Sequence, residues 1–395
     1  MIKILIPDYL GQQVISGIRV LGRKDIICDT AWNYCFHEKI SKSRYIHRMY
    51  QIPSAETDPL GYIDAINSLQ TTNSYDILLP FGSSAYNALA SNQDILSGDC
   101  KILLSSKDIF FLAFDKLNTF DFCQKTGIAT PMTFHDYHEN DLYAIGKEVK
   151  YPVVIKARSG SGVRTGLRFA NDYQELKEKY FELRTILENN PVLSHTEPII
   201  QEFIPGYIHD ACSVALDGEV KNILTQIRWW MYPISGGVGA INYTTNISVL
   251  KKIARKVLRN LKWTGPTQIE FKFDPRDKKY KLIEINPKFW GTLDLSIKAG
   301  LNFPEMVKKI LMNEKVEKVS YKSGIRYVFI FPQASLAFIQ LMLTEGFQKR
   351  SFSKEIIKTY VDFDIHDPLP DIYRAFLTAR KVMSPSYIRQ NTNVR

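Results

Sequence analysis

One stretch of the chain, TQIEFKFDPRDKKYKLIEINPKFWG at residues 267–291, constrains the fold more than any other. In its first half, apolar residues alternate with Glu270, Lys272 and Asp274, and this period of two predicts a β-strand. The segment PRDKK has the composition of a turn, and residues 280–286 have that of a second strand. The stretch therefore predicts an antiparallel hairpin.

The length of the loop sets which side chains of this hairpin face each other. If the segment PRDKK forms the loop, Asp274 faces Tyr280. Counting back then places Glu270 opposite Glu284, with Asn286 on the same side. A slip of the register by one residue would move every side chain to the other face.

The facing carboxylates predict a metal site. Two carboxylates opposite each other repel, whereas a divalent cation between them reverses that repulsion. Carboxylate, carboxamide and phosphate oxygens are ligands that Mg²⁺ accepts. A solvated hairpin with scattered charge is the simpler alternative, but the apolar, glycine-containing FWG that follows is unlike an open surface. We therefore expect Mg²⁺ or Mn²⁺ to be bound by Glu270, Glu284 and Asn286.

The composition is that of a chain with buried cores. Its 395 residues are 45% hydrophobic and 12% aromatic, enough for two or three domains. The first residues, MIKILIP, lack the apolar region and cleavage site of a secretory signal. The cysteines form no CxxC pair, which fits a reducing compartment; they are Cys28, Cys35, Cys100, Cys123 and Cys212. We expect a cytoplasmic protein.

The formal net charge of +10 allows two interpretations. It suits an anionic partner such as a nucleotide, an acidic carrier protein, nucleic acid or a membrane surface, but we favour the simpler interpretation, a mildly basic soluble enzyme. Lys and Arg are spread along the whole chain, and no basic block interleaves with aromatic residues as a nucleic-acid groove needs. We therefore expect no nucleic-acid partner.

The first part of the chain alternates strands and helices. Residues 2–6 predict a buried strand, residues 13–21 a helix, and residues 25–28 and 77–80 two further strands. This order indicates a parallel sheet with right-handed crossovers, and so a small α/β domain at residues 1–105. No GxGxxG follows the first strand, so the dinucleotide fingerprint is absent.

The middle of the chain predicts an α+β nucleotide-binding fold. A single helix begins at Lys107 with Ser106 as its N-cap and ends at Gly127, which serves as its C-cap. Strands follow, interrupted by helices at residues 172–188 and 249–261. The second of these helices leads into the hairpin.

The segment YPVVIKARSGSGVRTG, from Tyr151 to Gly166, predicts a strand that delivers Lys156 into a glycine-containing loop. Glycines let backbone N–H groups approach phosphate oxygens, and the lysine adds a positive charge. No GKS or GKT follows, so the loop is not a P-loop, and an ordinary turn is the alternative.

A second nucleotide-binding segment is IIQEF at residues 199–203, followed by Ile204, Pro205 and Gly206. The backbone groups left free beside the proline can pair with the edge of an adenine. Either His209 or Asp210 can accept hydrogen bonds from ribose hydroxyls. A strand that simply ends in a turn is the alternative.

Arg228 has two interpretations of equal weight. An arginine in this glycine-containing segment can hold a transferring phosphoryl group. It can also stack on Trp229 or Trp230 as a structural cation–π pair.

The last part of the chain is the hardest to interpret. Residues 327–343 contain no charged residue, but they include a proline and are shorter than the roughly 20 residues of a membrane-spanning helix. We expect a strand as far as Phe331 and an amphipathic helix from Gln333. With the basic QKR that follows, peripheral membrane contact through this region is a second interpretation.

Taken in order, these motifs resemble the ATP-grasp superfamily. DKL at residues 115–117 and GIATP at residues 127–131 are similar to the family's DK helix and its Gly-Ile-x-x-Pro exit. SRY at residues 43–45 and LLP at residues 78–80 resemble its preceding N-terminal domain. IEINPKFWG is the most specific motif, and the similarity runs from residue 1 to about residue 310.

The resemblance implies three parts of the chain. Residues 1–105 would be an α/β pre-ATP-grasp domain, and residues 106–315 an ATP-grasp domain with its lid at about residues 130–205. Residues 316–395 would be a C-terminal extension to which the resemblance assigns no role.

The resemblance also implies a role for each matching residue. The residues implied for the ATP phosphates are Lys116, Lys156 and the loop of Ser159, Gly160, Ser161, Gly162 and Val163. Those implied for the adenosine are Glu202, Phe203 and Ile204, with His209 or Asp210 at the ribose. Glu270, Glu284 and Asn286 would hold Mg²⁺, and Arg228 would face the γ-phosphate. The family often has arginine where this chain has Lys288, a point charge that cannot grip a carboxylate bidentately; we keep it beside Arg228 as a catalytic residue.

The implied activity is that of a carboxylate–amine ligase, similar to biotin carboxylase, carbamoyl phosphate synthetase and D-alanine–D-alanine ligase. A carboxylate would attack the γ-phosphate of MgATP to give an acyl-phosphate and ADP, and an amine would then displace phosphate. The substrates would be small or carrier-bound acids and amines, and we expect a homodimer. The alternatives are a phosphotransferase or modifier of a protein or cell-surface polymer, and a non-catalytic nucleotide-binding regulatory protein.

Overall fold

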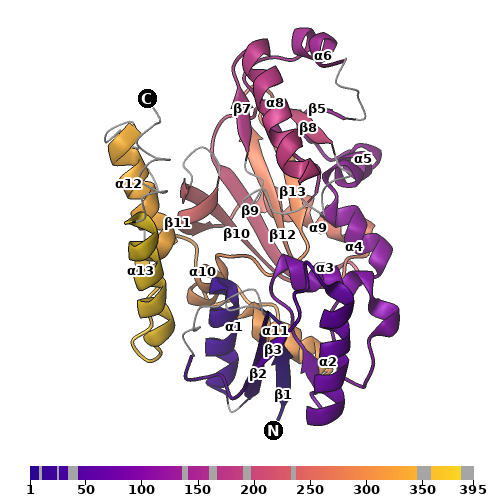
Figure 1. Cartoon of the computed structure of the whole chain (residues 1–395), viewed down its shortest axis with the longest axis vertical. Helices are drawn as coiled ribbons and strands as arrows, with labels where there is room; N and C mark the ends of the chain where they lie inside the picture. The colour runs from indigo at the N-terminus through magenta and orange to yellow at the C-terminus, as the bar shows by residue number, and fades with distance from the viewer. Residues whose placement is uncertain are drawn as a thin grey trace.

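The computed structural model contains three β-sheets arranged one above another in Figure 1. It describes residues 1–8, 11–24, 26–33, 43–135, 141–159, 167–189, 197–232, 237–344 and 357–383. A sheet of the N-terminal part lies at the bottom, a seven-stranded sheet lies in the middle, and a four-stranded lid sheet lies at the top (Figure 1). This combination of α/β and α+β parts confirms the predicted fold class.

The N-terminal sheet is parallel, with the strand order β3-β2-β1-β4. Its strands are β1 (Lys3–Ile6), β2 (Ile27–Asn33), β3 (Met49–Ile52) and β4 (Ile77–Leu78). The helices of this part are α1 (Gln12–Gly22), α2 (Pro59–Asn73), α3 (Ser83–Ser91) and the 3₁₀ helix η1 (Gln93–Ile95). The alternation of strands and helices along the chain therefore gives the parallel sheet that it predicts.

The single helix predicted from Lys107 is wrong, because the chain forms two helices there. They are α4 (Lys107–Phe114) and α5 (Lys116–Thr126). Asp115 between them is extended, and its carboxylate accepts the first N–H groups of α5 while Arg158 Nε donates to it at 2.7 Å. Ser106 occupies the N-cap position of α4 without a capping bond from its side chain, and Gly127 forms the expected left-handed C-cap of α5 with φ +64°.

The lid sheet has the order β5-β8-β6-β7, and all its pairs are antiparallel. Its strands are β5 (Thr133–Phe134), β6 (Val153–Ala157), β7 (Arg168–Ala170) and β8 (Pro198–Glu202), and its helices are α6 (Leu142–Glu148) and α8 (Tyr173–Glu188). Asp172 caps α8 by accepting the N–H of Glu175. Leu176, Tyr180 and Leu183 of α8 lie in the lid's own core.

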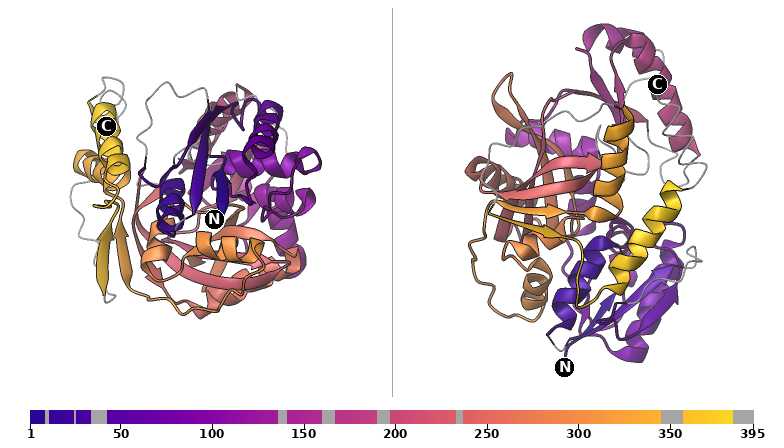
Figure 2. Two further views of the ribbon diagram at one scale, coloured as in Figure 1. Left: turned by 90° about the horizontal axis from the view of Figure 1, so that it is seen from below. Right: turned by 90° about the vertical axis from the view of Figure 1, so that its left-hand side faces the viewer.

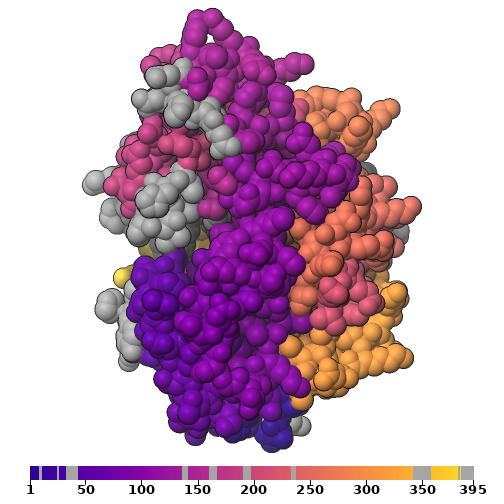
Figure 3. All heavy atoms as spheres, turned by 90° about the vertical axis from the view of Figure 1, so that its right-hand side faces the viewer, coloured from indigo at the N-terminus to yellow at the C-terminus, as the bar shows by residue number. Residues whose placement is uncertain are grey.

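The central sheet has the order β13-β12-β9-β10-β11-β14-β15. Its first five strands are β9 (Ile208–Leu216), β10 (Glu219–Tyr232), β11 (Val238–Thr245), β12 (Gly265–Asp274) and β13 (Lys279–Asn286). One face packs on α4 and on α9 (Ser248–Leu261). The other packs on the N-terminal sheet and on α10 (Leu293–Lys298) and α11 (Phe303–Leu311). Figure 3 shows the violet N-terminal part below the magenta lid, with the orange strands and helices beside both.

The hairpin forms as predicted, but its register changes once along its length. Asp274 pairs with Lys279, not with Tyr280, because the loop is one residue shorter than expected and Lys278 closes it in a left-handed conformation with φ +56°. A β-bulge at Ile283 then restores the count, so that Glu270 pairs with Glu284 as predicted.

The C-terminal part of the chain completes the central sheet. It contains β14 (Ile325–Val328), η3 (Ile330–Ala334), α12 (Ser335–Thr344), β15 (Lys358–Val361) and α13 (Leu369–Val382). The strand expected to reach Phe331 ends at Val328, where the chain turns into η3. Strands β14 and β15 pair in parallel beyond β11, and α12 and α13 stand together at one side of the molecule (Figures 1 and 2). The domain boundaries given above stay a prediction.

A buried charge network joins this C-terminal part to α1. Arg19 donates from Nε to Asp367 and from Nη2 to Asp371, both at 2.9 Å. Arg374 donates to Asp371, and Asp364 accepts a hydrogen bond from Arg23. We call the set the junction network: Arg19, Arg23, Asp364, Asp367, Asp371 and Arg374.

Two further observations concern single elements. The described cysteines, Cys28, Cys100, Cys123 and Cys212, form no disulfide, and Cys35 lies outside the described residues. Within the part of the chain that the structure describes, no helix has both the length and the apolar character needed to cross a bilayer.

Candidate functional site

The two predicted acids of the hairpin lie side by side on one face of the central sheet. Glu270 on β12 is 7% exposed, and Glu284 on β13 is its cross-strand neighbour. Asn286 donates from Nδ2 to Glu270 Oε1 and to Glu284 Oε1, each at 3.1 Å. One amide nitrogen is therefore shared between two like charges.

Arg228 on β10 approaches the same acids from the other side. It donates from Nε and Nη2 to Asp210 at 3.2 and 2.9 Å, and from Nη2 to Glu270. Asp210 is fully buried and also accepts a bond from Gln226 Nε2 at 2.8 Å. The guanidinium is thus held against carboxylates, and its binding of a phosphoryl group stays a prediction.

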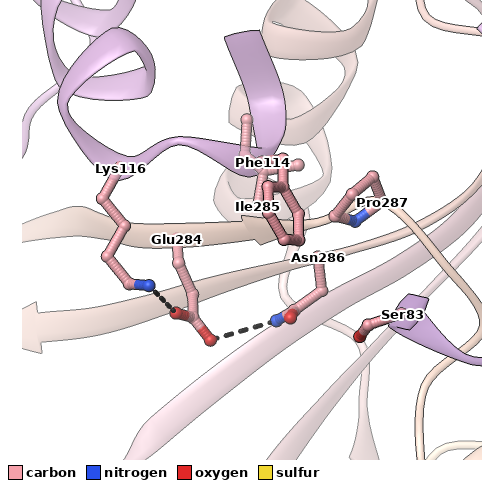
Figure 4. Close-up of a pocket in the computed structure, with 7 residues that line it drawn as sticks. All are labelled: Ser83, Phe114, Lys116, Glu284, Ile285, Asn286 and Pro287. Atoms are coloured by element: carbon pink, nitrogen blue, oxygen red, sulfur yellow. Dashed lines mark hydrogen bonds and ion pairs between the residues drawn. The ribbon is translucent and has the colours of Figure 1, made fainter. Parts of the chain in front are cut away.

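Two lysines of distant segments converge on Glu284. Lys116 at the start of α5 lies with Nζ 3.5 Å from Glu284 Oε2, in a small pocket lined also by Ser83 and Asn286 (Figure 4). Lys156 on β6 is 4% exposed and donates to Gln201 Oε1 at 2.8 Å. We call the central set the site network: Lys116, Asp210, Arg228, Glu270, Glu284 and Asn286.

The electrostatics of the two glutamates differ. Burial raises the pKa of Glu270 above its ordinary value, and the charge of Glu284 adds to this rise while Arg228 opposes it. Burial would also raise the pKa of Glu284, but the charges of Lys116 and Lys156 outweigh it and hold the pKa below its ordinary value. The pair therefore carries one carboxylate that ionises readily and one that ionises reluctantly.

Burial also changes the protonation of the lysines. It lowers the pKa of Lys156 to about 7, with the charge of Lys116 adding to the effect. The pKa of Lys288 is lowered by burial as well, although the charges of Glu284 and Glu270 oppose the change. A polyphosphate beside either side chain would favour the charged form of the lysine and so oppose this lowering of the pKa.

The side chains around Glu270 and Glu284 suit a hard divalent cation. Within the described ranges no three His, Cys, Asp or Glu side chains gather closely enough to hold a metal by themselves. The predicted ligands are instead two carboxylates and one amide, and such oxygen ligands would leave room for phosphate and water around Mg²⁺. The shared Nδ2 of Asn286 contacts both acids, and a cation there would lower the repulsion between the two carboxylates.

Two family models match the chain over this site. Residues 115–227 match the carbamoyl-phosphate synthase L chain, ATP binding domain, and residues 235–330 match the model described as ATP-grasp in the biosynthetic pathway with Ter operon. The first range includes Lys116 and Asp210, and the second includes the hairpin with Glu270, Glu284 and Asn286. Arg228 lies one residue beyond the first range. This chain is an ATP-grasp protein.

Similar proteins support the ATP-grasp fold. The large chain of carbamoyl phosphate synthase from Methanocorpusculum labreanum is 24% identical over 281 residues, which are 67% of this chain but 26% of that protein, so this chain spans about a quarter of its length. The biotin carboxylase domain of Hydrogenobacter thermophilus 2-oxoglutarate carboxylase, in complex with MgADP, ADP and bicarbonate, has a TM-score of 0.64 and 14% identity and covers 81% of this chain and 71% of its own. The L-amino acid ligase of Bacillus licheniformis has a TM-score of 0.61 and 16% identity, covering 78% and 73%.

The residues predicted to bind the adenosine of ATP contact the hairpin. Glu202 at the end of β8 pairs with Arg276 at 2.7 Å and with Lys281 at 3.1 Å. Lys272 on β12 donates to the carbonyl of Ile204 at 2.8 Å, and its ammonium lies 5.1 Å from the centre of the Phe203 ring. The predicted adenine-binding segment thus lies directly beside the hairpin.

The two ribose candidates lie on opposite faces of the central sheet. Asp210 pairs with Glu270 in register and faces the site, where its carboxylate already accepts a hydrogen bond from Arg228. His209 pairs with Phe271 and packs edge-on against Tyr280 with ring centres 5.3 Å apart. The structure therefore does not bring His209 together with the other predicted residues.

The glycine loop of the ATP-grasp lid is only partly described. Ser159 follows the end of β6, two residues beyond Ala157. The remaining predicted loop residues lie outside the described residues: Gly160, Ser161, Gly162 and Val163.

Several polar residues of the ATP-grasp site escape sequence reasoning. Lys281 pairs with Lys272 only because the loop of the hairpin is one residue shorter than expected. Asn242 on β11 pairs with Arg228 in register, is fully buried, and has no hydrogen-bond partner for either amide atom among the described residues. That Asn242 lies beside Arg228 can be recognised only once the order of the strands is known.

Proposed function

We propose that the chain is an ADP-forming ligase that activates a carboxylate as an acyl-phosphate with MgATP and joins it to an amine. The observation that carries the proposal is the cross-strand pair of Glu270 and Glu284, bridged by the amide of Asn286. Unrelieved repulsion between these acids is unfavourable, and a Mg²⁺ ion bound to the ATP phosphates relieves it.

The protein's own residues would act mainly by positioning and charge. Lys116 and Lys156 would hold the phosphates, since the positive charges of both lysines act on Glu284. Arg228 would stabilise the oxygens of the transferring phosphoryl group, for which it must release part of its hold on Asp210 or Glu270. The bound Mg²⁺ would supply neutralisation of the phosphate charge.

Lys288 would serve the carboxylate substrate. It lies two residues beyond Asn286, and its charge interacts with Glu284, with Glu270 and with Asp8 at the end of β1. Burial raises the pKa of Asp8 to about 6, although backbone N–H groups of Phe81 and Gly82 oppose the rise. We therefore propose that the acid substrate binds between the hairpin and the N-terminal sheet.

The similar proteins supply the reaction class of the proposal. One of the solved structures is an L-amino acid ligase and another holds MgADP and bicarbonate, so both handle a carboxylate or its inorganic counterpart. The acid, the amine and the cytoplasmic location remain parts of this proposal, as does a homodimer.

A hydroxylamine trap tests the reaction class. The protein is incubated with MgATP, hydroxylamine and a panel of carboxylic acids that includes amino acids, and ADP, free phosphate and hydroxamate are measured. A ligase releases ADP, phosphate and hydroxamate in equal amounts, and only when its acid substrate is present. The Glu284→Gln variant should release none of the three. Formation of a stable phosphorylated product without free phosphate would instead show a phosphotransferase.

A further inference from the structure

Strand β11 carries an asparagine that is not part of the site network. Asn242 is 0% exposed and lies in register between Arg228 of β10 and Tyr327 of β14. Both polar atoms of its amide are buried, and neither has a hydrogen-bond partner within the described part of the chain. A buried amide without partners costs stability, so a purely structural role does not explain an asparagine at this position.

A second buried asparagine shows what a structural role requires. Asn222 on β10 is 6% exposed. Its Nδ2 donates to the carbonyl of Glu317 at 2.8 Å, and its Oδ1 accepts the N–H of Val319 at 2.9 Å. Both polar atoms of Asn222 thus have protein partners, and this residue is the natural comparison for Asn242.

Another unpartnered oxygen lies diagonally across from Asn242. Gln226 of β10 is fully buried and pairs in register with Thr244, two residues after Asn242, so the two amides share one face of the sheet. Gln226 Nε2 donates to Asp210 at 2.8 Å and to Thr292 Oγ1 at 2.6 Å, but its Oε1 has no partner among the residues described. We call Asn242 and Gln226 the amide pair. Together they offer two acceptor oxygens and one donor nitrogen.

Two glycines leave room around the amide pair. A Cβ added to Gly239 would lie 2.2 Å from Asn242 Oδ1, so the amide occupies the space that a side chain at residue 239 would take. Among the described residues, a Cβ added to Gly291 would meet only Cγ1 of Val238, at 4.0 Å. Gly291 directly precedes the threonine that accepts the bond from Gln226, so this open space lies next to the amide pair.

We propose that the amide pair binds the amine substrate of the ligation, an inference that rests on the proposed function. The N–H groups of a primary amine would donate to Asn242 Oδ1 and Gln226 Oε1. Because these acceptors are neutral, they hold an amine without favouring its protonated form as a carboxylate would. The positive charge of Arg228 beside them disfavours that form as well. The amide pair therefore suits the unprotonated amine, which is the nucleophile.

The position of the amide pair suits the second step of the proposed reaction. Arg228, the proposed contact of the transferring phosphoryl group, is the neighbour of Asn242 in register. The nitrogen lone pair would form a bond to the acyl carbon while the bond from that carbon to the phosphate oxygen breaks. Inorganic phosphate leaves with the electron pair and takes up the proton that the nitrogen loses. Nδ2 of Asn242 would donate to an oxygen close to the nitrogen of the amine, such as the one that hydroxylamine carries.

Thermal unfolding without ligands tests whether the amide of Asn242 is structural. Asn242→Leu replaces it by an apolar side chain of similar volume, and Asn222→Leu is the matched control, since both polar atoms of Asn222 are bonded. Asn242→Leu should unfold at the wild-type temperature or above it, and Asn222→Leu below it. An unfolding temperature of Asn242→Leu as low as that of the control overturns the inference.

The hydroxylamine trap gives the second measurement. A further variant, Gly239→Ala, keeps the amide of Asn242 but displaces it. With MgATP and the acid that the panel identifies, the KM for hydroxylamine should rise at least about tenfold in Asn242→Leu and several-fold in Gly239→Ala, whereas the KM for MgATP and for the acid should change by less than about twofold. An equal KM for hydroxylamine in the wild type and in Asn242→Leu overturns the inference and leaves the proposed ligase activity intact.

Unfolding in the presence of amines separates this result from a failure of the proposed function. The probes are methylamine and tetramethylammonium, which has no N–H group, at about pH 10, close to the pKa of an alkylamine. If no acid yields hydroxamate, the ligase proposal fails. Stabilisation of the wild type by methylamine alone, absent in Asn242→Leu, would then still support the amide pair as an amine site. Equal responses to the two probes without hydroxamate would overturn both proposals.

Discussion

Two buried charge networks of the described residues compensate their acids in different ways. In the junction network each acid has donor atoms of its own, since Arg19 uses Nε for Asp367 and Nη2 for Asp371. Asp367 accepts from Arg19 Nε at 2.9 Å, from the Ser43 hydroxyl at 2.7 Å and from the Arg44 N–H at 2.9 Å. Asp371 accepts from Arg19 and Arg374, and also from the N–H of Asp364.

In the site network the acids share their donors. One nitrogen of Asn286 serves both Glu270 and Glu284, and one nitrogen of Arg228 serves both Asp210 and Glu270. A network with a separate donor for each acid holds two parts of the chain together. A network in which two acids share one donor can exchange that donor for a cation. We therefore expect the two networks to respond differently to the removal of a donor side chain.

The largest effect is expected from breaking the junction network. Arg19→Met leaves Asp367 and Asp371 buried without their main partner, and removal of one member of a buried ion pair costs about 3–5 kcal/mol. Urea unfolding measures the loss, with or without Mg²⁺. Arg23→Met is the control, because its side chain is 39% exposed and its pair is worth at most about 1 kcal/mol. Equal small losses in both variants would show that the junction network does not hold α1 to the C-terminal part.

Removal of the shared donor should have a smaller effect, and one that Mg²⁺ reverses. Asn286→Ala deprives both glutamates of the bridging N–H, and a hydrogen bond to a charged group contributes about 1.5–3 kcal/mol. Urea unfolding without metal should show this loss, whereas the exposed control Asn246→Ala should lose almost nothing. Asn286→Asp sharpens the comparison, since it should be less stable still without metal and gain the most from Mg²⁺. An Asp variant that Mg²⁺ does not stabilise contradicts the assignment of the site.

Lys156 offers a test by pH. Its pKa of about 7 in the folded protein lies below the value near 10.4 of an unfolded lysine, so between these values the unfolded chain binds more protons. The wild type should therefore gain stability as the pH rises from about 7 toward 10, by about 1 kcal/mol per pH unit in the middle of the range. Lys156→Met should lack this gain, so its stability relative to the wild type should be greatest near pH 7. Parallel pH profiles for the two proteins would show that Lys156 keeps its ordinary pKa.

The smallest effect is expected at the contact between Arg276 of the hairpin loop and Glu202, which we call the hinge. Arg276→Gln removes the contacts with Glu202 and with Asp274, each at 2.7 Å. The arginine side chain is 48% exposed, however, and Lys281 remains as a partner of both acids. The loss of stability should be at most about 1 kcal/mol. Unfolding in urea measures it, and a loss as large as that of Arg19→Met would place the hinge among the structural networks.

The hairpin shows how far the sequence reaches. Alternation of apolar and charged residues predicts both strands and the pairing of Glu270 with Glu284. It does not predict the bulge at Ile283, because Leu282 and Ile285 must both reach one core, and that demand comes from the opposing helices. The convergence of Lys116 on Glu284 likewise depends on the packing of α5 against β13, which no local pattern encodes.

The C-terminal part shows where the sequence fails. Helix α13 (Leu369–Val382) is not among the predicted helices, and its sequence does not say which side faces the protein. The usual expectation of apolar side chains inside is wrong here, because Asp371 finds its partner in Arg19, 352 residues away along the chain. Strand β15 is equally hard to predict from the sequence, because it is short and pairs in parallel with β14 after a long connection.

The central claim is that a divalent cation bound with ATP lies between Glu270 and Glu284. Thermal unfolding of the wild type and of Glu284→Ala, each with and without MgATP, tests it most directly. At about 100 times its dissociation constant MgATP should stabilise the wild type by roughly 2.7 kcal/mol, in a manner that depends on Mg²⁺, and should leave Glu284→Ala unchanged. The same shift in both proteins, or none in the wild type, would contradict the account.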